Sequence, residues 1–266
     1  MVEETLVNKF IKIALFVDSF GYKQLIDLIK HKNIGCIVVA SNRNYYKSIY
    51  NILPKKIPIL VQPSKQDYQR YKVFLWKLKS LKIDFIISNS YSMLITEEIL
   101  KLVRFKAINI HWSLLPKNRG SNPIQWAIIK DEDYTGITIH KMDKNIDTGK
   151  IVFQKNIKIE ESYTWTKLNK ILIKKSKTYI KKCLSKILLG NIKSKKQCID
   201  DATVNKRLTK DFPLIDFNMD DKTIYNLIRA QVKPLSGAYI IKDNKRIYFN
   251  TFIKLEDISK LREKYE

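Results

Sequence analysis

Cysteine and glycine are scarce in this chain of 266 residues, and each scarcity excludes a class of protein. The three cysteines, Cys36, Cys183 and Cys198, are too widely separated for a disulfide framework or a zinc knuckle, and they favour a reduced, cytoplasmic compartment and no bound metal. The seven glycines form no Gly-x-Gly-x-x-Gly pattern, which excludes a dinucleotide-binding fingerprint.

Long hydrophobic runs are missing as well, although 45% of the residues are hydrophobic. The best candidate, 10–17, has eight residues and contains Lys12, whereas a membrane helix needs about 18 uninterrupted apolar residues. The sequence opens with Met-Val-Glu-Glu, which is acidic where a signal peptide is basic. We therefore expect no membrane span and no export, and the apolar content suffices for a large core.

Arginine is rare among the basic residues: eight of the 50 are arginines and 42 are lysines, for a formal net charge of +24. Half of this excess lies in 155–210, which contains 16 basic and four acidic residues. Clustered cations favour polyanions, because binding releases phosphate counterions. A lysine excess is more typical of a solvated surface, so nucleic acid is not expected as the partner.

The first 110 residues alternate between short apolar runs and segments of helical length. The apolar runs are rich in β-branched residues, which is typical of parallel strands covered on both faces. The alternation predicts an α/β fold with a doubly wound, mostly parallel, Rossmann-like sheet. The expected strands span 11–17, 34–40, 57–61, 84–87 and 107–110, and the expected helices span 22–31, 45–53, 66–81 and 96–103.

A second set of elements completes the first domain, expected to span 1–191. It consists of a short helix that starts at Pro123, two strands and a long helix closed by Gly190-Asn191. The ranges of the last three are 135–142, 150–159 and 163–189.

The remaining residues predict a linker and a small tail. Residues 192–208 are polar and lysine-rich without an apolar period, which is typical of a linker. The tail, 209–266, is expected to be a small α+β region with a helix over 223–230 and a β-hairpin around Asp243-Asn244. About 60 residues are too few for an independent core, so the tail should pack on the first domain, on a second copy of the chain, or on both.

The candidate catalytic residues lie near the fifth expected strand. Asn109 and His111 are two apart at its carboxyl end and therefore share one face. Ligands bind at this edge of such sheets. Asp147 lies in a turn between two later strands. An amide, an imidazole and a carboxylate placed this way could serve as oxyanion donor, base and orienting anion. Taken alone the trio does not decide a function, because a strand-end histidine is more often structural.

The whole segment 107–154 closely resembles the folate-dependent formyltransferase family. The family pattern runs Asn-x-His-x-Ser-Leu-Leu-Pro, then Arg-Gly, Gly-[Val/Ile]-Thr-x-His and Asp-x-Gly. The matching residues are Asn109, His111, Ser113, Leu114, Leu115, Pro116, Arg119, Gly120, Gly136, Ile137, Thr138, His140, Asp147 and Gly149. The tail residues 224–230 and 234–238 resemble, more faintly, a block of the two-domain members.

This resemblance implies that 1–191 is a formyltransferase domain that uses 10-formyltetrahydrofolate as co-substrate, with no metal. Asn109 would donate a hydrogen bond to the oxyanion, His111 would handle the proton, and Asp147 would orient the imidazole. The pterin would contact two loops largely through backbone groups. The residues at these positions are Met93, Leu94, Ile95, Asp143, Lys144, Asn145 and Ile146.

Four branches of the family differ in the amine that they formylate. Glycinamide ribonucleotide enzymes usually end near the long helix, and the formyltetrahydrofolate hydrolases carry a domain before the first strand. Methionyl-tRNA formyltransferases carry a longer C-terminal barrel, and their first turn usually reads Gly-Thr-Pro where this chain has Asp18-Ser19-Phe20. The remaining branch formylates nucleotide-linked amino sugars. We therefore favour a dTDP- or UDP-linked 4-amino-4-deoxysugar as acceptor, with dTDP-4-amino-4,6-dideoxyglucose as the preferred candidate, for O-antigen or another surface glycan. Methionyl-tRNA is the alternative.

Four residues are candidates for the sugar-nucleotide side, since a diphosphate favours fixed cations and donors. They are Lys117, Arg119, Asn226 and Arg229. Arg229 could equally brace two parts of the chain. Trp112 could stack on the substrate or fill the wall of the site. In this branch the tail hairpin often builds a homodimer, which we expect here as well.

Overall fold

The computed structural model describes residues 11–26, 33–41, 56–104, 106–188, 193–209 and 211–265. The helix expected over 45–53 and the helix end at Gly190-Asn191 lie outside these residues. The chain folds into two compact units, and each unit is made of three separate segments of the sequence. The first comprises 1–111, 138–153 and 176–197, and the second comprises 112–137, 154–175 and 198–266.

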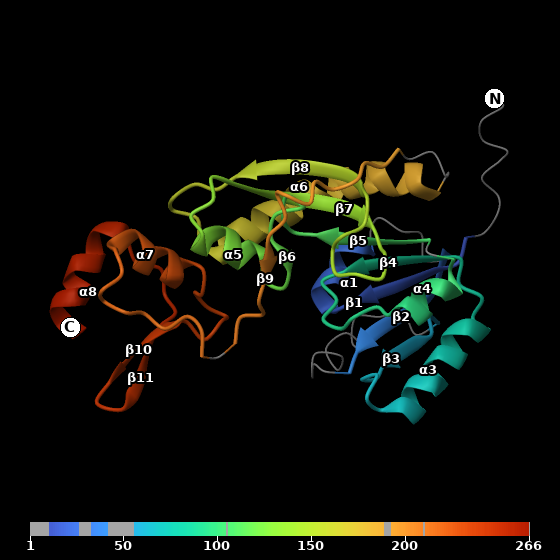
Figure 1. The fold of residues 1–266 in the computed structure, drawn as a ribbon, viewed down its shortest axis with the longest axis horizontal. Coiled ribbons are helices and arrows are strands. Elements are labelled where there is room, and N and C mark those ends of the chain that lie inside the picture. Colours follow the sequence, from blue (N-terminus) through green and yellow to red (C-terminus); the bar gives the residue numbers. More distant parts are fainter. Residues whose placement is uncertain are drawn as a thin grey trace. The chain divides into compact units, whose positions relative to one another are not determined.

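The predicted doubly wound, mostly parallel sheet is confirmed, with the strand order β3-β2-β1-β4-β5-β7-β8 (Figure 1). The first five strands pair in parallel, and β7 pairs with β5 in the antiparallel direction. All five residues of β1 are buried, as expected for a strand that is covered on both faces. The strands are β1 Ile13–Val17, β2 Ile34–Ala40, β3 Ile59–Gln62, β4 Phe85–Asn89, β5 Ala107–His111, β7 Tyr134–Lys141 and β8 Ile151–Lys158.

Three described helices lie entirely in this first unit: α1 Ser19–Leu25, α3 Tyr68–Ser80 and α4 Glu97–Leu102. Helix α3 buries one stripe, Tyr71, Phe74 and Leu78, in a core shared with β1, β2 and β4. Helix α1 begins beside the carboxyl end of β4. A side chain at Gly21 would lie 2.2 Å from the carbonyl oxygen of Asn89, so glycine is required there.

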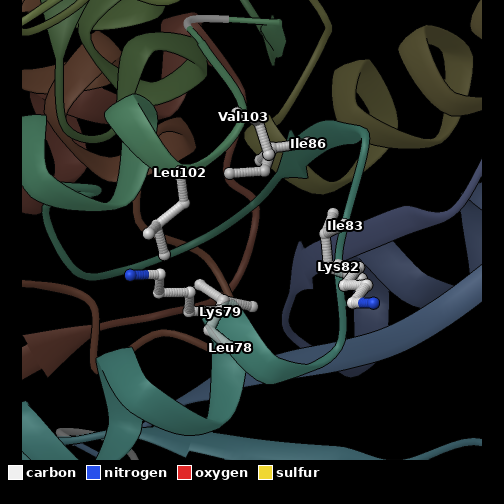
Figure 2. Close-up of a pocket in the computed structure, with 7 residues that line it drawn as sticks. All are labelled: Leu78, Lys79, Lys82, Ile83, Ile86, Leu102 and Val103. Carbon is white, nitrogen blue, oxygen red and sulfur yellow. The ribbon is translucent and has the colours of Figure 1, made fainter.

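A small cavity in the first unit lies at the amino-terminal end of β4, the opposite end of the sheet from His111 (Figure 2). Its volume of about 40 Å³ has room for a water molecule or two, far less than a substrate needs. It is a packing gap rather than a candidate site. Its lining residues are Leu78, Lys79, Lys82, Ile83, Ile86, Leu102 and Val103.

The second unit contains the tail together with α5 Pro123–Ile129 and β6 Arg119–Gly120. The tail forms α7 Asp221–Arg229, a hairpin of β10 Ala238–Lys242 and β11 Lys245–Phe249, a short turn of 3-10 helix and α8 Ile258–Tyr265. The hairpin turn is Asp243-Asn244, as predicted, with φ of 52° and 59°. These elements enclose a hydrophobic cluster of their own, to which Ile129 adds. Helix α8, which the sequence analysis did not predict, closes this cluster through Ile258.

The segment expected as a linker, 192–208, forms two backbone pairings in its described part. Lys195 pairs with Ile151 in the first unit, and β9, Val204–Asn205, pairs in parallel with β6 in the second. Backbone ladders of this kind need no apolar period, which explains why the sequence pattern did not reveal them. The long helix α6, Trp165–Leu188, buries Leu168 and Leu172 and exposes its lysines. No described helix combines the length and apolarity needed to cross a bilayer.

Candidate active site

Adjacent antiparallel strands gather three polar side chains on one face of the first unit. In the register of β5 and β7, Asn109 lies opposite His140 and His111 lies opposite Thr138. Directly opposed residues of an antiparallel pair point to the same face, and so do residues two apart in one strand. Asn109, His111 and His140 therefore share a face at the carboxyl end of β5.

A tight loop after β7 carries the fourth residue, Asp147. Asp147 adopts a left-handed backbone conformation, with φ of 55°. Two residues later the loop passes so close to β7 that a side chain at Gly149 would lie 1.7 Å from the carbonyl oxygen of Lys141. Within the loop, the carboxylate of Asp143 accepts hydrogen bonds from the hydroxyl of Thr148 (2.6 Å) and the backbone N–H of Asn145 (3.0 Å). These two hydrogen bonds connect both ends of the segment 143–148 through one carboxylate.

The carboxylate of Asp147 lies at the centre of the cluster. Its Oδ1 accepts a hydrogen bond from Nδ2 of Asn109 (3.2 Å) and lies 3.3 Å from Nε2 of His140. Its Oδ2 lies 3.6 Å from Nδ1 of His111. The side chains of His111 and Asp147 are 7% and 11% exposed, so their charges interact with little solvent between them. The structure thus brings together the three residues expected to be catalytic.

His140 is a member of this cluster to which the sequence analysis gave no role. Its Nδ1 lies 2.8 Å from the carbonyl oxygen of Lys141, which can only accept, so Nδ1 carries a hydrogen. A neutral ring would then accept at Nε2 from Asn109 (3.3 Å), whereas a protonated ring would donate to Asp147. The signal was present in the sequence, because His140 is the last residue of the Gly-Ile-Thr-x-His pattern and faces Asn109 across the ladder.

The arrangement combines a hydrogen-bond donor, proton-exchanging rings and a fixed anion. The amide of Asn109 has two N–H groups; one donates to Asp147, and the other can stabilise a developing negative charge when it is not donated to His140. The carboxylate of Asp147, with Oδ2 3.6 Å from Nδ1 of His111, can orient the imidazole ring of His111. Although two histidines and a carboxylate meet here, no group of acidic, histidine or cysteine side chains in the described residues is arranged to hold a metal ion.

The loops expected to contact the pterin, one before β5 and one directly before Asp147, expose apolar side chains. Leu94 follows β4 and is 55% exposed, and Ile146 precedes Asp147 and is 58% exposed. Ile95 is buried, and the sulfur of Met93 lies 3.8 Å from the hydroxyl of Ser41. The backbone carbonyl of Leu94 accepts a hydrogen bond from Gln62 (3.0 Å). Lys144 and Asn145 are exposed.

The four residues expected on the sugar-nucleotide side all belong to the second unit. Lys117 is exposed, and Arg119 lies in β6. Asn226 and Arg229 are buried in α7 and bind other protein groups: Nε of Arg229 donates to Oδ1 of Asn226 (2.7 Å), and Nη1 donates to the carbonyl of Tyr163 (2.8 Å). Nδ2 of Asn226 donates to Asp131 (3.0 Å). Burial lowers the pKa of the Arg229 guanidinium. These contacts have the form of a brace.

Trp112 follows His111 and is 7% exposed, so most of its ring packs against protein atoms. Its indole Nε1 is buried and has no hydrogen-bond partner within the described part of the chain. Of the two alternatives given by the sequence, this burial favours a packing role over stacking on a substrate. The unpaired indole donor is the feature that packing alone does not explain.

Comparisons with known proteins place this geometry in context. A family model described as formyl transferase matches residues 11–184. The bifunctional polymyxin resistance protein ArnA of Wigglesworthia glossinidia brevipalpis is 39% identical over 221 residues, 82% of this chain and 33% of that protein. A methionyl-tRNA formyltransferase of Thermotoga maritima is 40% identical over 164 residues, 61% of this chain and 52% of that protein. One of Clostridium beijerinckii is 34% identical over 254 residues, 92% of this chain and 79% of that protein. The chain thus spans about a third and about half of the first two relatives.

Solved structures share the fold over most of the chain. A 4-N formyltransferase from Francisella tularensis superposes with a TM-score of 0.73 at 22% identity, covering 92% of this chain and 98% of that chain. An N-formyltransferase from Helicobacter canadensis, solved with folinic acid and dTDP-3-aminofucose, gives a TM-score of 0.65 at 18% identity, covering 89% of this chain and 86% of that chain. At these identities the likeness concerns the fold.

Proposed function

The chain belongs to the formyl transferase family, and from this membership we propose that it transfers the formyl group of 10-formyltetrahydrofolate to the amine of a nucleotide-linked amino sugar. The observation that carries the proposal is the convergence of Asn109, His111 and Asp147 at the carboxyl end of β5. These groups match the needs of acyl transfer to an amine, which develops an oxyanion and releases a proton.

In the proposed reaction the amine nitrogen attacks the formyl carbon, and a tetrahedral intermediate forms. Asn109 donates a hydrogen bond to its oxyanion. His111 takes the proton that the amine loses, and Asp147 stabilises the resulting imidazolium. The bond between the formyl carbon and N10 of the folate then breaks, and the proton passes to N10. The products are the formamide and tetrahydrofolate, so atoms and charges balance without a metal or an oxidant.

We place the pterin of the co-substrate against the two loops with exposed apolar side chains. Leu94 and Ile146 each expose more than half of their surface, and a flat ring system would cover them. Backbone groups of 93–95 and 143–146 would supply the hydrogen bonds. The three free thiols, Cys36, Cys183 and Cys198, support the cytoplasm as the compartment of the reaction.

The acceptor that we propose is a dTDP- or UDP-linked 4-amino-4-deoxysugar, with dTDP-4-amino-4,6-dideoxyglucose as the preferred candidate and a surface glycan such as O-antigen as the destination. Support comes from solved relatives of almost the same length as this chain, one of which is a 4-N formyltransferase and another of which was solved with a dTDP-amino sugar. Lys117 and Arg119 are the proposed partners of the diphosphate, whereas the brace-like contacts of Asn226 and Arg229 make them weaker candidates.

Homodimer formation through the tail hairpin is part of the same proposal. Ile241 and Tyr248 lie on the outer face of the hairpin and are 58% and 42% exposed. A second copy of the chain would cover them. Sedimentation of the purified protein tests this, and a monomer at micromolar concentration would contradict it.

Methionyl-tRNA is the second candidate acceptor, because the curated relatives of 34–40% identity include methionyl-tRNA formyltransferases. The exposed lysines of α6 would suit a polyanion. This candidate predicts formylation that weakens steeply with salt, whereas a small nucleotide sugar with two phosphates predicts a shallow dependence.

One assay separates the two candidates. The purified protein is incubated with 10-formyltetrahydrofolate and, separately, with dTDP-amino sugars, UDP-amino sugars and charged initiator tRNA, while release of tetrahydrofolate is followed optically. We expect turnover with a nucleotide sugar, and the matched His111→Ala variant serves as the inactive control. Formylation of the tRNA alone would overturn the proposed acceptor.

A further inference from the structure

A glutamine outside the residues matched by the family model holds the loop of Asp147. The side-chain Nε2 of Gln197 donates one hydrogen bond to the carbonyl of Asp147 (2.8 Å) and another to the carbonyl of Gly149 (2.9 Å). The family model ends at residue 184. We propose that Gln197 is a positioning residue for formyl transfer, which acts by fixing the backbone of Asp147.

The hydrogen-bond chemistry identifies which end of the amide faces the loop. Both loop partners are carbonyl oxygens, which only accept, so the NH₂ group must face them. Both hydrogens of that group are then used on one loop. The direction of a carbonyl is set by ψ of its residue, so the two bonds fix ψ at Asp147 and at Gly149.

Asp147 needs such external support because its backbone is unfavourable for a non-glycine residue. A left-handed conformation persists where the surroundings enforce it. Its carboxylate must also meet Asn109, His111 and His140 at separations of 3.2–3.6 Å, so a small rotation of the backbone would move it out of reach. Within the loop, the carboxylate of Asp143 accepts hydrogen bonds from Thr148 and Asn145, whereas the carbonyls of Asp147 and Gly149 accept from Gln197.

The two hydrogen bonds from Gln197 to the loop form a clamp, and the segment that carries Gln197 is itself fixed to the sheet. Two residues before Gln197, Lys195 exchanges two backbone hydrogen bonds with Ile151 at the start of β8 (2.8 and 2.9 Å). The loop leads directly into β8, and the segment that carries Gln197 pairs with the first residue of β8, so both are attached to the same strand. The segment expected to be a mere linker therefore contributes to the placement of the proposed catalytic carboxylate.

The inference rests on the proposed formyl transfer, and it is tested in the whole chain of 266 residues. Gln197→Glu keeps the size of the side chain but places carboxylate oxygens against two carbonyl oxygens. We expect kcat to fall about tenfold to hundredfold, with KM for the amine and for the folate changed by less than about twofold. The matched control is Lys196→Gln, which makes the same change of charge at the exposed neighbouring residue and should leave kcat unchanged.

A double-mutant cycle separates positioning from general structure. If Gln197 acts through Asp147, Gln197→Glu should cause no further loss of kcat in an Asp147→Asn background. Equal losses in both backgrounds, or an unchanged kcat in the single variant, would overturn the inference. The outcome does not depend on whether the variants are slightly less stable, because both arms carry the same substitution.

Hydrogen exchange of the loop amides tests the role of Gln197 without any turnover, so it is independent of the test of the proposed function. Amides of 143–151 should exchange severalfold faster in Gln197→Glu than in the wild type or in Lys196→Gln. If the wild type formylates none of the acceptors, the proposed function fails while this measurement still reports on the clamp. Unchanged exchange in the loop would show that Gln197 does not hold it.

Discussion

Two buried charged clusters, one in each compact unit, are built in different ways. Around Arg229 the closest partners are an amide oxygen and a backbone carbonyl, at 2.7 and 2.8 Å, and neither can titrate; the half-exposed carboxylate of Asp131 lies farther away, at 3.6 Å. Around Asp147 the partners are an amide and two imidazoles at 3.2–3.6 Å. Short bonds to groups of fixed protonation suit a brace. Longer contacts between groups that exchange protons suit chemistry. Burial of a charge therefore does not by itself identify a catalytic residue.

The largest expected effect lies in the Asp147 cluster. Asp147→Asn preserves the shape of the side chain but removes its charge, so it no longer stabilises a protonated His111. We expect formyl transfer to fall by about 10²–10⁴-fold, with the melting temperature little changed. Initial rates and thermal unfolding of the same preparations check this. Near-normal turnover would mean that the cluster is structural.

The next largest effect concerns the backbone that carries this carboxylate. A methyl group at Gly149 would lie 1.7 Å from the carbonyl of Lys141, so Gly149→Ala must displace the loop or β7. We expect kcat to fall by about tenfold or more together with a loss of about 2 kcal/mol in the free energy of unfolding. Rates and denaturant titration measure both. The serine at 121, exposed and outside the loop, offers Ser121→Ala as a control.

The Arg229 cluster should respond in the opposite sense. Arg229→Met leaves acceptors at Asn226 and Tyr163 without their donor, so we expect a loss of about 2–4 kcal/mol in the free energy of unfolding. Turnover per folded molecule should be unchanged. A raised KM for the nucleotide sugar at unchanged stability would instead establish Arg229 as a substrate ligand and break the comparison.

The smallest effect is expected at the start of α7. Hydrogen bonds from Thr223 lower the pKa of Asp220, which caps this helix. The folded state therefore favours the carboxylate, and its contribution to stability is present at neutral pH and is lost as the pH falls through the lowered pKa. Asp220→Ala should lower the melting temperature by a few degrees at pH 7. The difference from the wild type should vanish in acid, and activity should not change.

The parallel sheet could be predicted because its strands are apolar on both faces, a pattern independent of their partners. Ile34–Ala40 was predicted with the bounds that the structure shows. Helix α8 was missed although Ile258, Leu261 and Tyr265 lie at helical spacing, because this pattern covers only two turns and Ile258 alone is fully buried. Pairings of Lys195 and Val204 were missed for a related reason: they depend on backbone hydrogen bonds, which the side-chain pattern does not record.

In the candidate site, too, some residues could be predicted from the sequence and others could not. Asn109, His111 and Asp147 could be proposed from a contiguous motif, and the structure places them together. The contact of His140 with Asp147 required the strand register, which pairs it with Asn109. Gln197 lies 50 residues beyond Asp147 and binds backbone atoms, so no side-chain pattern could connect the two. The brace-like contacts of Arg229 likewise depend on neighbours distant in the sequence.

The three thiols differ in exposure, which allows selective labelling next to Gln197. Burial raises the pKa of Cys36 to about 12 and that of Cys183 to about 11, whereas Cys198 is exposed and follows Gln197 directly. Alkylating reagents react with accessible thiolates. A maleimide dye at about pH 7 should therefore attach to Cys198 alone. Its fluorescence would report on folate binding without any cysteine being introduced or removed.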